Sequence, residues 1–449
     1  MSQETNTNDT KIDESLFSNG RGIVLFLLVL VYTFNFLDRQ ILSILAPDIQ
    51  KELGLDDGAL GLLMGLPFAL FYAVLGIPVA YYADRTSRTW IMTIALTIWS
   101  AMTALCGMAQ NLFQLTIARM FVGVGEAGGV APAYSLISDY FPPHQRARAL
   151  GIYSFGIPIG SAIGIIFGAV IATILDWRAA FLIVGFLGIL LAPIFRLLIK
   201  EPVRGAYDSQ KQQSEPAKVS EVIKVLISKP SFWTLSIGAS FSSMMGYGLF
   251  AWLPAFFVRS YGDILPQFMS WIPDFLVPNG AGAKLYAGYF YGTIVLIGGI
   301  FGIYLGGVVS DKLGKADKGA YAMVPAVAFA CAIPVFLVGT FTTSLTVSFF
   351  VMLIPTALSL VWLGPVLSAF QHIVKPNMRS TASALFLLIN NLIGIGLGTY
   401  LIGLLSKNLA AVYGTESLRY SIMYGTSFYV VAAVLMFISS KLLAKDWEE

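Results

Sequence analysis

The sequence predicts an all-α polytopic membrane protein in which twelve transmembrane helices form two six-helix halves. Three observations carry this prediction: the composition, the number of apolar runs and the placement of the basic residues. Of the 449 residues, 57% are hydrophobic and only 12% are charged, against roughly 25% charged in soluble domains. A soluble protein of this composition could not cover its surface with polar side chains, so most of the chain is expected to lie in a bilayer.

The apolar runs set the domain boundaries, because a helix needs about 20 apolar residues to cross the bilayer core. Twelve such runs occur, at about 22–46, 60–80, 90–109, 112–138, 149–174, 179–198, 231–258, 285–310, 320–341, 344–370, 380–405 and 420–441. We expect a disordered cytosolic tail at 1–20, a first half at 21–199, a cytosolic linker with a short amphipathic helix at 200–230, and a second half with a short tail at 231–449.

The basic residues give the orientation of these spans. With a cytosolic N-terminus, 20 of the 28 Lys and Arg residues fall in inner loops and tails, six in outer loops and two within spans. Cytosolic loops carry an excess of Lys and Arg, so both termini are expected in the cytosol.

The same features exclude other classes of protein. The composition does not suit a soluble enzyme, a nucleic-acid-binding protein or a disulfide scaffold. Cys106 and Cys331 lie in apolar runs without metal-binding or redox spacing, so we expect no cofactor and no metal. The sequence offers neither an interfacial catalytic set, as a lipid-modifying enzyme needs, nor a filter segment, as a channel needs. Of the classes considered, a membrane transporter remains, and we expect it to be a monomer.

The two halves repeat one another in sequence. The segment AYYADRTSR at 80–88 corresponds to GVVSDKLGK at 307–315, an offset of 227 residues, and PHQR at 143–146 corresponds to PNMR at 376–379, an offset of 233. Two echoes at nearly the same offset indicate a duplicated six-helix unit. Parallel repeats of this kind build transporters that rock around a site between the halves.

The segments at 80–88 and 307–315 resemble the two copies of the signature loop of the major facilitator superfamily, and Arg119-x-x-x-Gly123-x-Gly125 resembles its helix 4 motif. The first loop departs from the pattern, since Ala80 and Ser87 stand where glycines are usual. The resemblance covers nearly the whole chain and implies the major facilitator fold. It also implies gating roles for the loop residues, which are Asp84, Arg85, Arg88, Asp311 and Lys312.

A closer resemblance is to the spinster subfamily. It rests on NFLDR at 35–39, GEA at 125–127 and IPIGS at 157–161. Animal members of that subfamily export sphingosine-1-phosphate and related lysolipids, and the short tails here resemble those of a bacterial member. The resemblance therefore implies lipid export across a bacterial inner membrane.

Four charged residues lie well inside the apolar runs: Asp38, Arg39, Arg119 and Glu126, all on spans 1 and 4. Each costs about 2.5–3.5 kcal/mol at mid-helix on insertion scales, so they require mutual compensation or a function. A charge network that only ties span 1 to span 4 is one reading, and a substrate and proton site is the other. We expect Asp38 to pair with Arg119 and Arg39 to meet an anionic headgroup or, without substrate, Glu126.

The residue types suggest how such a site works. Arginine binds phosphate through a planar fork that stays charged. A carboxyl whose arginine partner comes and goes changes its proton affinity, so Glu126, with Asp38, is the candidate for proton coupling. If substrate competes with Glu126 for Arg39, proton and substrate are expected to exclude one another, which gives antiport.

Span 7 supplies the candidate apolar contacts, because Tyr247 and Trp252 lie in its most deformable stretch, near two glycines and Pro254. Simple packing explains these two side chains equally well. Together with Arg39, Arg119 and Glu126 they are the candidate substrate-binding residues.

The sequence thus predicts a proton-coupled secondary transporter that exports an amphiphilic lysolipid such as sphingosine-1-phosphate by alternating access. The alternative is a proton-coupled transporter of small organic anions or drugs. The expected partners are the substrate, protons and membrane lipids.

Overall fold

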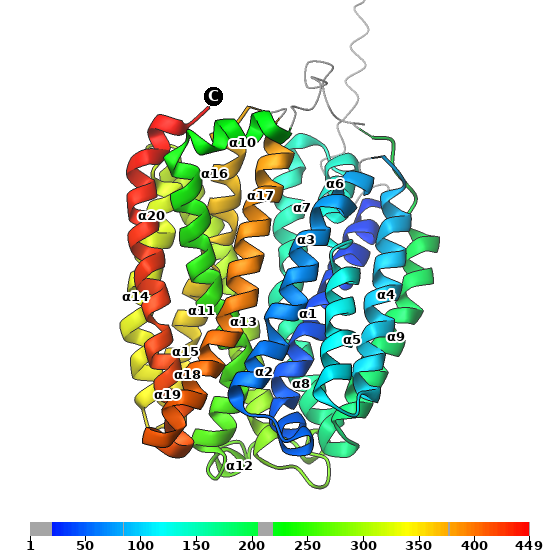
Figure 1. Cartoon of the computed structure of the whole chain (residues 1–449), viewed down its shortest axis with the longest axis vertical. Coiled ribbons are helices and arrows are strands. Elements are labelled where there is room, and N and C mark those ends of the chain that lie inside the picture. The colour runs from blue at the N-terminus through cyan, green and yellow to red at the C-terminus, as the bar shows by residue number, and fades with distance from the viewer. Residues whose placement is uncertain (1–19, 84, 205–218, 376–377, 449) are drawn as a thin grey trace, which may run out of the picture.

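The computed structural model describes residues 20–83, 85–204, 219–375 and 378–448, and every regular element in these ranges is helical. Two helical bundles lie side by side, one formed by the first part of the chain and one by the second (Figure 1). The C-terminus and α10 lie at one end of the bundles, called here the linker end, and α12 lies at the other, called the far end. Asp84 and nearly all of the predicted tail lie outside the described residues.

The first half contains nine helices among the described residues. They are α1 (Arg21–Leu53), α2 (Asp57–Met64), α3 (Leu66–Ala83), α4 (Arg88–Met108), α5 (Leu112–Glu126), α6 (Val130–Tyr140), α7 (Pro143–Ser154), α8 (Gly156–Ile174) and α9 (Trp177–Leu198).

The linker contributes α10 (Val219–Ile227), a helix in which Val222 and Leu226 are buried. The second half follows. Its helices are α11 (Pro230–Tyr261), α12 (Leu265–Phe268), η3 (Asp274–Leu276), α13 (Ala283–Gly314), α14 (Ala320–Phe341), α15 (Leu345–Leu360), α16 (Leu363–Ile373), α17 (Arg379–Asn391), the π-helical turn η5 (Leu392–Leu397), α18 (Gly398–Tyr413), η6 (Gly414–Glu416), α19 (Ser417–Gly425) and α20 (Ser427–Asp446).

These helices make twelve crossings, which confirms the predicted fold class. Eleven stretches of the described chain are long and apolar enough to span a bilayer, and the last of them, Thr381–Asp446, has 66 residues. At 1.5 Å per residue this stretch is far too long for one crossing of a ~30 Å core. It turns at η6 and crosses twice.

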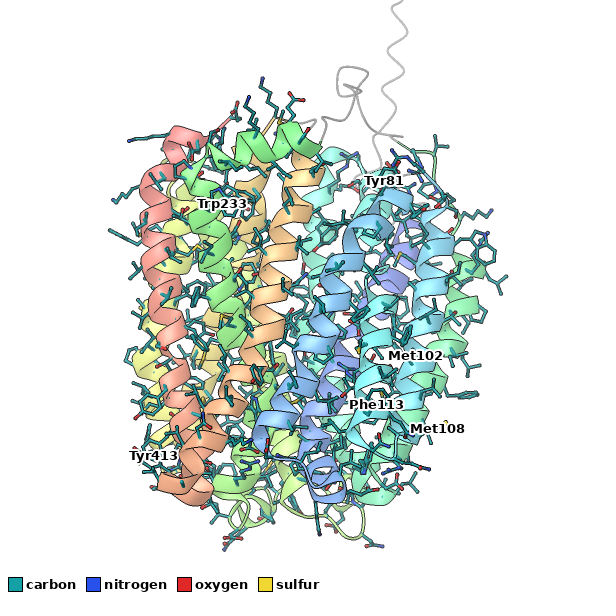
Figure 2. All side chains as sticks on the ribbon, viewed as in Figure 1. Tyr81, Met102, Met108, Phe113, Trp233 and Tyr413 are labelled. Atoms are coloured by element: carbon teal, nitrogen blue, oxygen red, sulfur yellow. The ribbon has the colours of Figure 1, made fainter. Side chains whose placement is uncertain are left out.

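The exposed side chains fit a lipid environment. Large apolar residues are exposed on both halves, including Phe113, Phe186, Phe301 and Phe437. Tyr81 and Trp233 lie toward the linker end, and Phe113 and Tyr413 lie toward the far end (Figure 2). Aromatic side chains near both ends of a spanning bundle are typical of the two membrane interfaces.

The halves meet most closely where α2 and α3 pack against η5 and α18. Gly65, between α2 and α3, lies directly against the other half: an added Cβ would be 2.1 Å from the Thr399 Oγ1, 2.7 Å from the Gly396 carbonyl oxygen and 2.9 Å from the Ile395 carbonyl oxygen. We call this contact the glycine seam. It brings the backbones of the two halves together as only small residues allow.

A second close contact joins α8 to α13. A Cβ on Gly288 would lie 2.6 Å from the Ala169 Cβ, and one on Gly292 would lie 2.7 Å from Ile166. Three ion pairs also join the halves, all between residues near the far end: Arg259–Asp57 at 2.7 Å, Lys407–Asp56 at 3.0 Å, and Lys284–Asp48. The far end is therefore closed.

The linker end of the second half is tied together by one lysine. The Lys229 Nζ donates to the Ile373 carbonyl at 2.7 Å, to the Asp446 carbonyl at 3.0 Å and to the Glu448 carboxylate at 2.5 Å. The Ser231 backbone N–H donates to the Asp446 carboxylate at 3.0 Å. The C-terminal residues thus close the start of α11 against the ends of α16 and α20.

Candidate functional site

A buried cluster of charged side chains joins α1 and α5. Asp38 and Arg39 come from the middle of α1, and Arg119 and Glu126 come from α5, seven residues or two turns apart. Asp38, Arg119 and Glu126 are at most 2% exposed, and the Arg39 side chain is 9% exposed. All four predicted residues therefore belong to one site.

The sequence of α5 explains how this cluster is brought close to its neighbours. A Cβ on Gly123 would lie 2.5 Å from the Phe68 carbonyl oxygen of α3, and a Cβ on Gly125 would lie 2.6 Å from the Trp99 backbone nitrogen of α4. Glycines at these two positions let α3 and α4 approach α5 closely. The two glycines of the Arg119-x-x-x-Gly123-x-Gly125 motif thus let α3 and α4 pack closely around the end of α5, where Glu126 is buried.

The ion pairs follow the expected partners. The Arg39 Nε and Nη2 both lie 2.7 Å from the Glu126 Oε2. The Arg119 Nη1 lies 3.5 Å from the Asp38 Oδ1, and the Thr103 hydroxyl donates to the other Asp38 oxygen at 2.7 Å. Helical side chains lean toward the N-terminus of their helix, which is why Arg39 reaches Glu126 although Glu126 lies about 10 Å from Arg119 along α5.

Several polar atoms of this cluster have no hydrogen-bond partner among the described residues. They are the Arg119 Nε and Nη1, the Asp38 Oδ1 and the Glu126 Oε1. A buried donor without a partner costs free energy. The Arg119 guanidinium, although it lies 3.5 Å from the Asp38 carboxylate, therefore keeps donors that a bound anion could use.

A cavity opens beside the two arginines and is lined by both halves. The first half contributes Arg39, Gln40, Ser43, Met64, Phe68 and Arg119, and the second half contributes Tyr247, Phe250, Ala251, Ile395 and Thr399. The wall from the first half carries the charges, and the wall from the second half is mainly apolar.

The two candidate residues on span 7, Tyr247 and Trp252, occupy different environments. Tyr247 lines the cavity and interacts with Arg39. Trp252 does not line it: the indole is fully buried and its Nε1 donates to the Thr399 carbonyl at 2.9 Å. Trp252 therefore packs α11 against α18, which is the simple packing that was the other possibility.

The candidate gating residues are not all in equivalent positions. Arg85 is exposed and stacks on Tyr81, with 3.5 Å between the Arg85 Cζ and the ring centroid. Asp311 and Lys312 are exposed at the end of α13. Asp84 lies outside the described residues.

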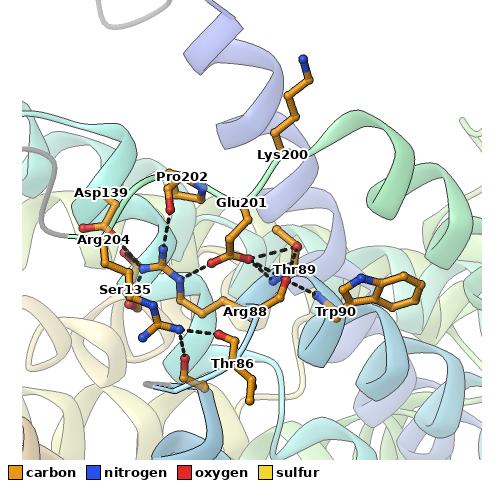
Figure 3. Close-up of polar contacts among 12 residues, drawn as sticks. Thr86, Arg88, Thr89, Trp90, Ser135, Asp139, Lys200, Glu201, Pro202 and Arg204 are labelled. Atoms are coloured by element: carbon orange, nitrogen blue, oxygen red, sulfur yellow. Dashed lines mark hydrogen bonds and ion pairs between the residues drawn. The ribbon is translucent and has the colours of Figure 1, made fainter.

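Arg88, in contrast, is buried in a polar network of the first half at the linker end (Figure 3). It donates to the Glu201 carboxylate at 2.7 Å, to the Ser135 hydroxyl at 2.8 Å and to Asp139. The Thr89 backbone N–H donates to the second Glu201 oxygen at 2.9 Å. Arg88 thus ties α4 to α6 and to the segment after α9, all within one half.

Sequence reasoning missed the aromatic rings around the charges. The Arg39 guanidinium lies 5.1 Å from the Phe36 ring centroid, 4.8 Å from that of Phe68 and 4.8 Å from that of Tyr72. In an apolar span these rings look like ordinary packing residues, so no local signal distinguishes them.

The fold and the site together define a class of protein: a polytopic membrane transporter whose duplicated halves enclose a charged cavity. The chain belongs to the Major Facilitator Superfamily, whose profile matches residues 28–399.

Within this superfamily its relatives include the Spinster proteins. A solved structure of a bacterial homologue of the human lysosomal transporter Spinster, inward-facing and unoccupied, matches with a TM-score of 0.79 and 32% identity, over 96% of this chain and 98% of that one. Human protein spinster homolog 1 is 29% identical over 87% of this chain and 74% of its own length. An MFS-type efflux pump of Mycolicibacterium smegmatis is 30% identical over 93% of this chain and 92% of its own length.

Proposed function

We propose that this chain is a proton-coupled secondary transporter that exports an amphiphilic lysolipid anion, such as sphingosine-1-phosphate, by alternating access. The observation that carries the proposal is the pair of buried arginines on one cavity wall, with two Arg119 donors unbonded among the described residues. Arginine donors in a desolvated site form strong charge-assisted hydrogen bonds to phosphate oxygens.

The amphiphilic nature of the substrate is supported by the asymmetry of the cavity. Arg39, Arg119, Gln40 and Ser43 offer polar contacts from the first half, whereas Phe250, Ala251 and Ile395 offer apolar contacts from the second. A headgroup would bind to the first wall and a hydrocarbon chain would extend along the second. The resemblance to the spinster subfamily, whose animal members export lysolipids, supports this substrate class.

The proton site is proposed at Glu126, assisted by Asp38. A charged Glu126 holds Arg39 through two contacts of 2.7 Å, and protonation turns this ion pair into a weaker neutral contact. Arg39 would then be released to a substrate anion. In one conformation, proton and anion therefore favour each other's binding, because both oppose the same ion pair.

The contact between Arg39 and Glu126 therefore leads to a different coupling from the one expected from the sequence, in which proton and substrate exclude one another. The two compete with the Arg39–Glu126 contact rather than with each other. Antiport would therefore need the proton and the anion to bind in different conformations, one open to each side of the membrane. The direction of coupling must therefore be read from transport itself.

Alternating access would use the two ends of the molecule in turn. We infer that the linker end faces the cytosol and that the membrane is a bacterial inner membrane, with the far-end ion pairs and the glycine seam closed as described. Similarity to an inward-facing Spinster homologue supports this orientation. A cytosolic latch would involve Arg85, Asp311 and Lys312, with Asp84, whereas Arg88 would act by holding its own half rigid.

Transport in proteoliposomes tests the proposal. The purified protein would be reconstituted with sphingosine-1-phosphate, lysophospholipids and small organic anions, each with a pH gradient of either sign. Lipid flux that follows the gradient in the wild type and loses this dependence in Glu126→Gln would support the proposal. Arg39→Ala should abolish flux. The matched control for Glu126→Gln is Glu221→Gln, the same substitution on the exposed face of α10.

The alternative function is proton-coupled transport of small organic anions or drugs. The similarity to an MFS-type efflux pump favours it. Flux of small anions or drugs with inert lipids would select this alternative. Gradient-dependent lipid flux that persists in Glu126→Gln would refute the role of Glu126.

A further inference from the structure

One aromatic ring lies against both buried arginines. The Phe68 ring centroid is 4.8 Å from the Arg39 Cζ and 5.2 Å from the Arg119 Cζ. Phe68 is 1% exposed, and it lines the same cavity as the two guanidinium groups. The charges alone do not point to this residue, since Phe68 belongs to an apolar stretch of α3.

The position of this ring is fixed on two sides. Its backbone carbonyl lies against Gly123 of α5, where a Cβ would approach to 2.5 Å. Its ring stacks on Tyr72 at 5.5 Å between centroids, with planes inclined by 15°. Phe68 therefore has little freedom to move away from the arginines.

The two arginines need such support. Like charges repel strongly in a site of low dielectric constant. Arg39 has Glu126 as a close counter-ion at 2.7 Å, but Arg119 has only a 3.5 Å contact with Asp38. The face of an aromatic ring is negative and attracts a guanidinium, most strongly where water is excluded.

We propose that Phe68 is a positioning residue that holds Arg39 and Arg119 side by side, so that one doubly charged headgroup meets both. The proposal rests on the proposed function. A phosphate monoester carries between one and two negative charges near neutral pH, and two arginines offer donors to several of its oxygens. A singly charged headgroup gains less from the second arginine.

Ligand binding to the purified protein in nanodiscs tests this role without depending on the direction of transport. The probes are lysophosphatidic acid, a phosphate monoester, and lysophosphatidylglycerol, a phosphodiester with the same acyl chain. Phe68→Leu should weaken binding of the monoester about tenfold or more and that of the diester about threefold or less. Phe250→Leu is the matched control, because Phe250 lines the cavity but its ring contacts no Arg or Lys side chain among the described residues. This variant should weaken the binding of both probes equally.

A second measurement separates the ring's charge distribution from its shape. Fluorinated phenylalanines at position 68 keep the ring's size while withdrawing electron density from its face. Affinity for the monoester should fall stepwise with each added fluorine. Wild-type affinity across the fluorine series, or equal losses for both probes in Phe68→Leu, would overturn the proposal.

Failure of the proposed function would look different. If the wild type binds and transports neither lipid, the substrate class is wrong. If the wild type binds both and Phe68→Leu binds them equally well, the substrate class stands and the role of Phe68 is wrong.

Discussion

The glycine seam offers a direct way to shift the balance between the two states of the transporter. In Gly65→Ala, the new methyl group would meet two backbone carbonyls, 2.7 Å away at Gly396 and 2.9 Å away at Ile395. Ordinary van der Waals contact begins near 3.4 Å, so the halves would have to separate by 0.5 to 0.7 Å at this point. The nearer Thr399 hydroxyl, at 2.1 Å, can rotate away, but the carbonyls cannot.

Overpacking of this kind costs about 1–3 kcal/mol. If the contact exists only when the far end is closed, the whole cost falls on that state. At 1.4 kcal/mol per factor of ten, the ratio of closed to open far ends should fall about 5- to 150-fold. Transport should slow, because one of its two states becomes rare.

Pulsed electron spin resonance measures this shift. Spin labels would replace Lys51 and Asn408, which are both exposed near the far end, after removal of Cys106 and Cys331. Gly65→Ala should shift the population toward longer label distances. Gly76→Ala is the control, since a Cβ there, on α3, has no atom within 4 Å. Identical distance distributions in the wild type and Gly65→Ala would refute the argument.

Two further predictions concern stability. Although partial burial opposes it, hydrogen bonds from Thr89 and Arg88 lower the pKa of Glu201 to about 2. A lowered pKa stabilises the fold above the ordinary value near 4.3, and this contribution is lost as pH falls toward 2. Thermal unfolding should therefore show Glu201→Gln less stable than the wild type at pH 7, with the difference shrinking as the pH falls from about 4 toward 2; a difference that stays unchanged over that range would contradict the pairing. Trp252→Phe removes the hydrogen bond to the Thr399 carbonyl. We therefore expect the free energy of unfolding to fall by about 1 kcal/mol, while the KM for substrate stays unchanged. A raised KM would indicate that Trp252 contributes to substrate binding.

Much of the fold follows from hydropathy and charge. Long apolar runs and the distribution of Lys and Arg predict the crossings. They do not predict where a span breaks into two helices. The break between α5 and α6, after Glu126, lies inside one continuous apolar run. Such a break depends on how neighbouring helices pack, which the run itself does not record.

The charge cluster was predictable because charged residues in apolar spans are rare and helical spacing limits their partners. The position of Trp252 was also open to geometric reasoning. It lies five residues after Tyr247, a rotation of about 140° around the helix, so the two could not face the same cavity. The far-end pairs, such as Arg259 with Asp57, join distant parts of the chain and require the arrangement of the halves to be known.

The ties at the linker end also bear on the order in which the protein can assemble during synthesis. Arg88 meets Glu201 113 residues later, so the first half can complete its network before the second half has been made. Lys229 must wait for Glu448, which lies 219 residues further along the chain. Because N-terminal units generally fold first during translation, the first half would serve as a finished surface on which the second is built. The second half would gain this tie only after α20 has been made.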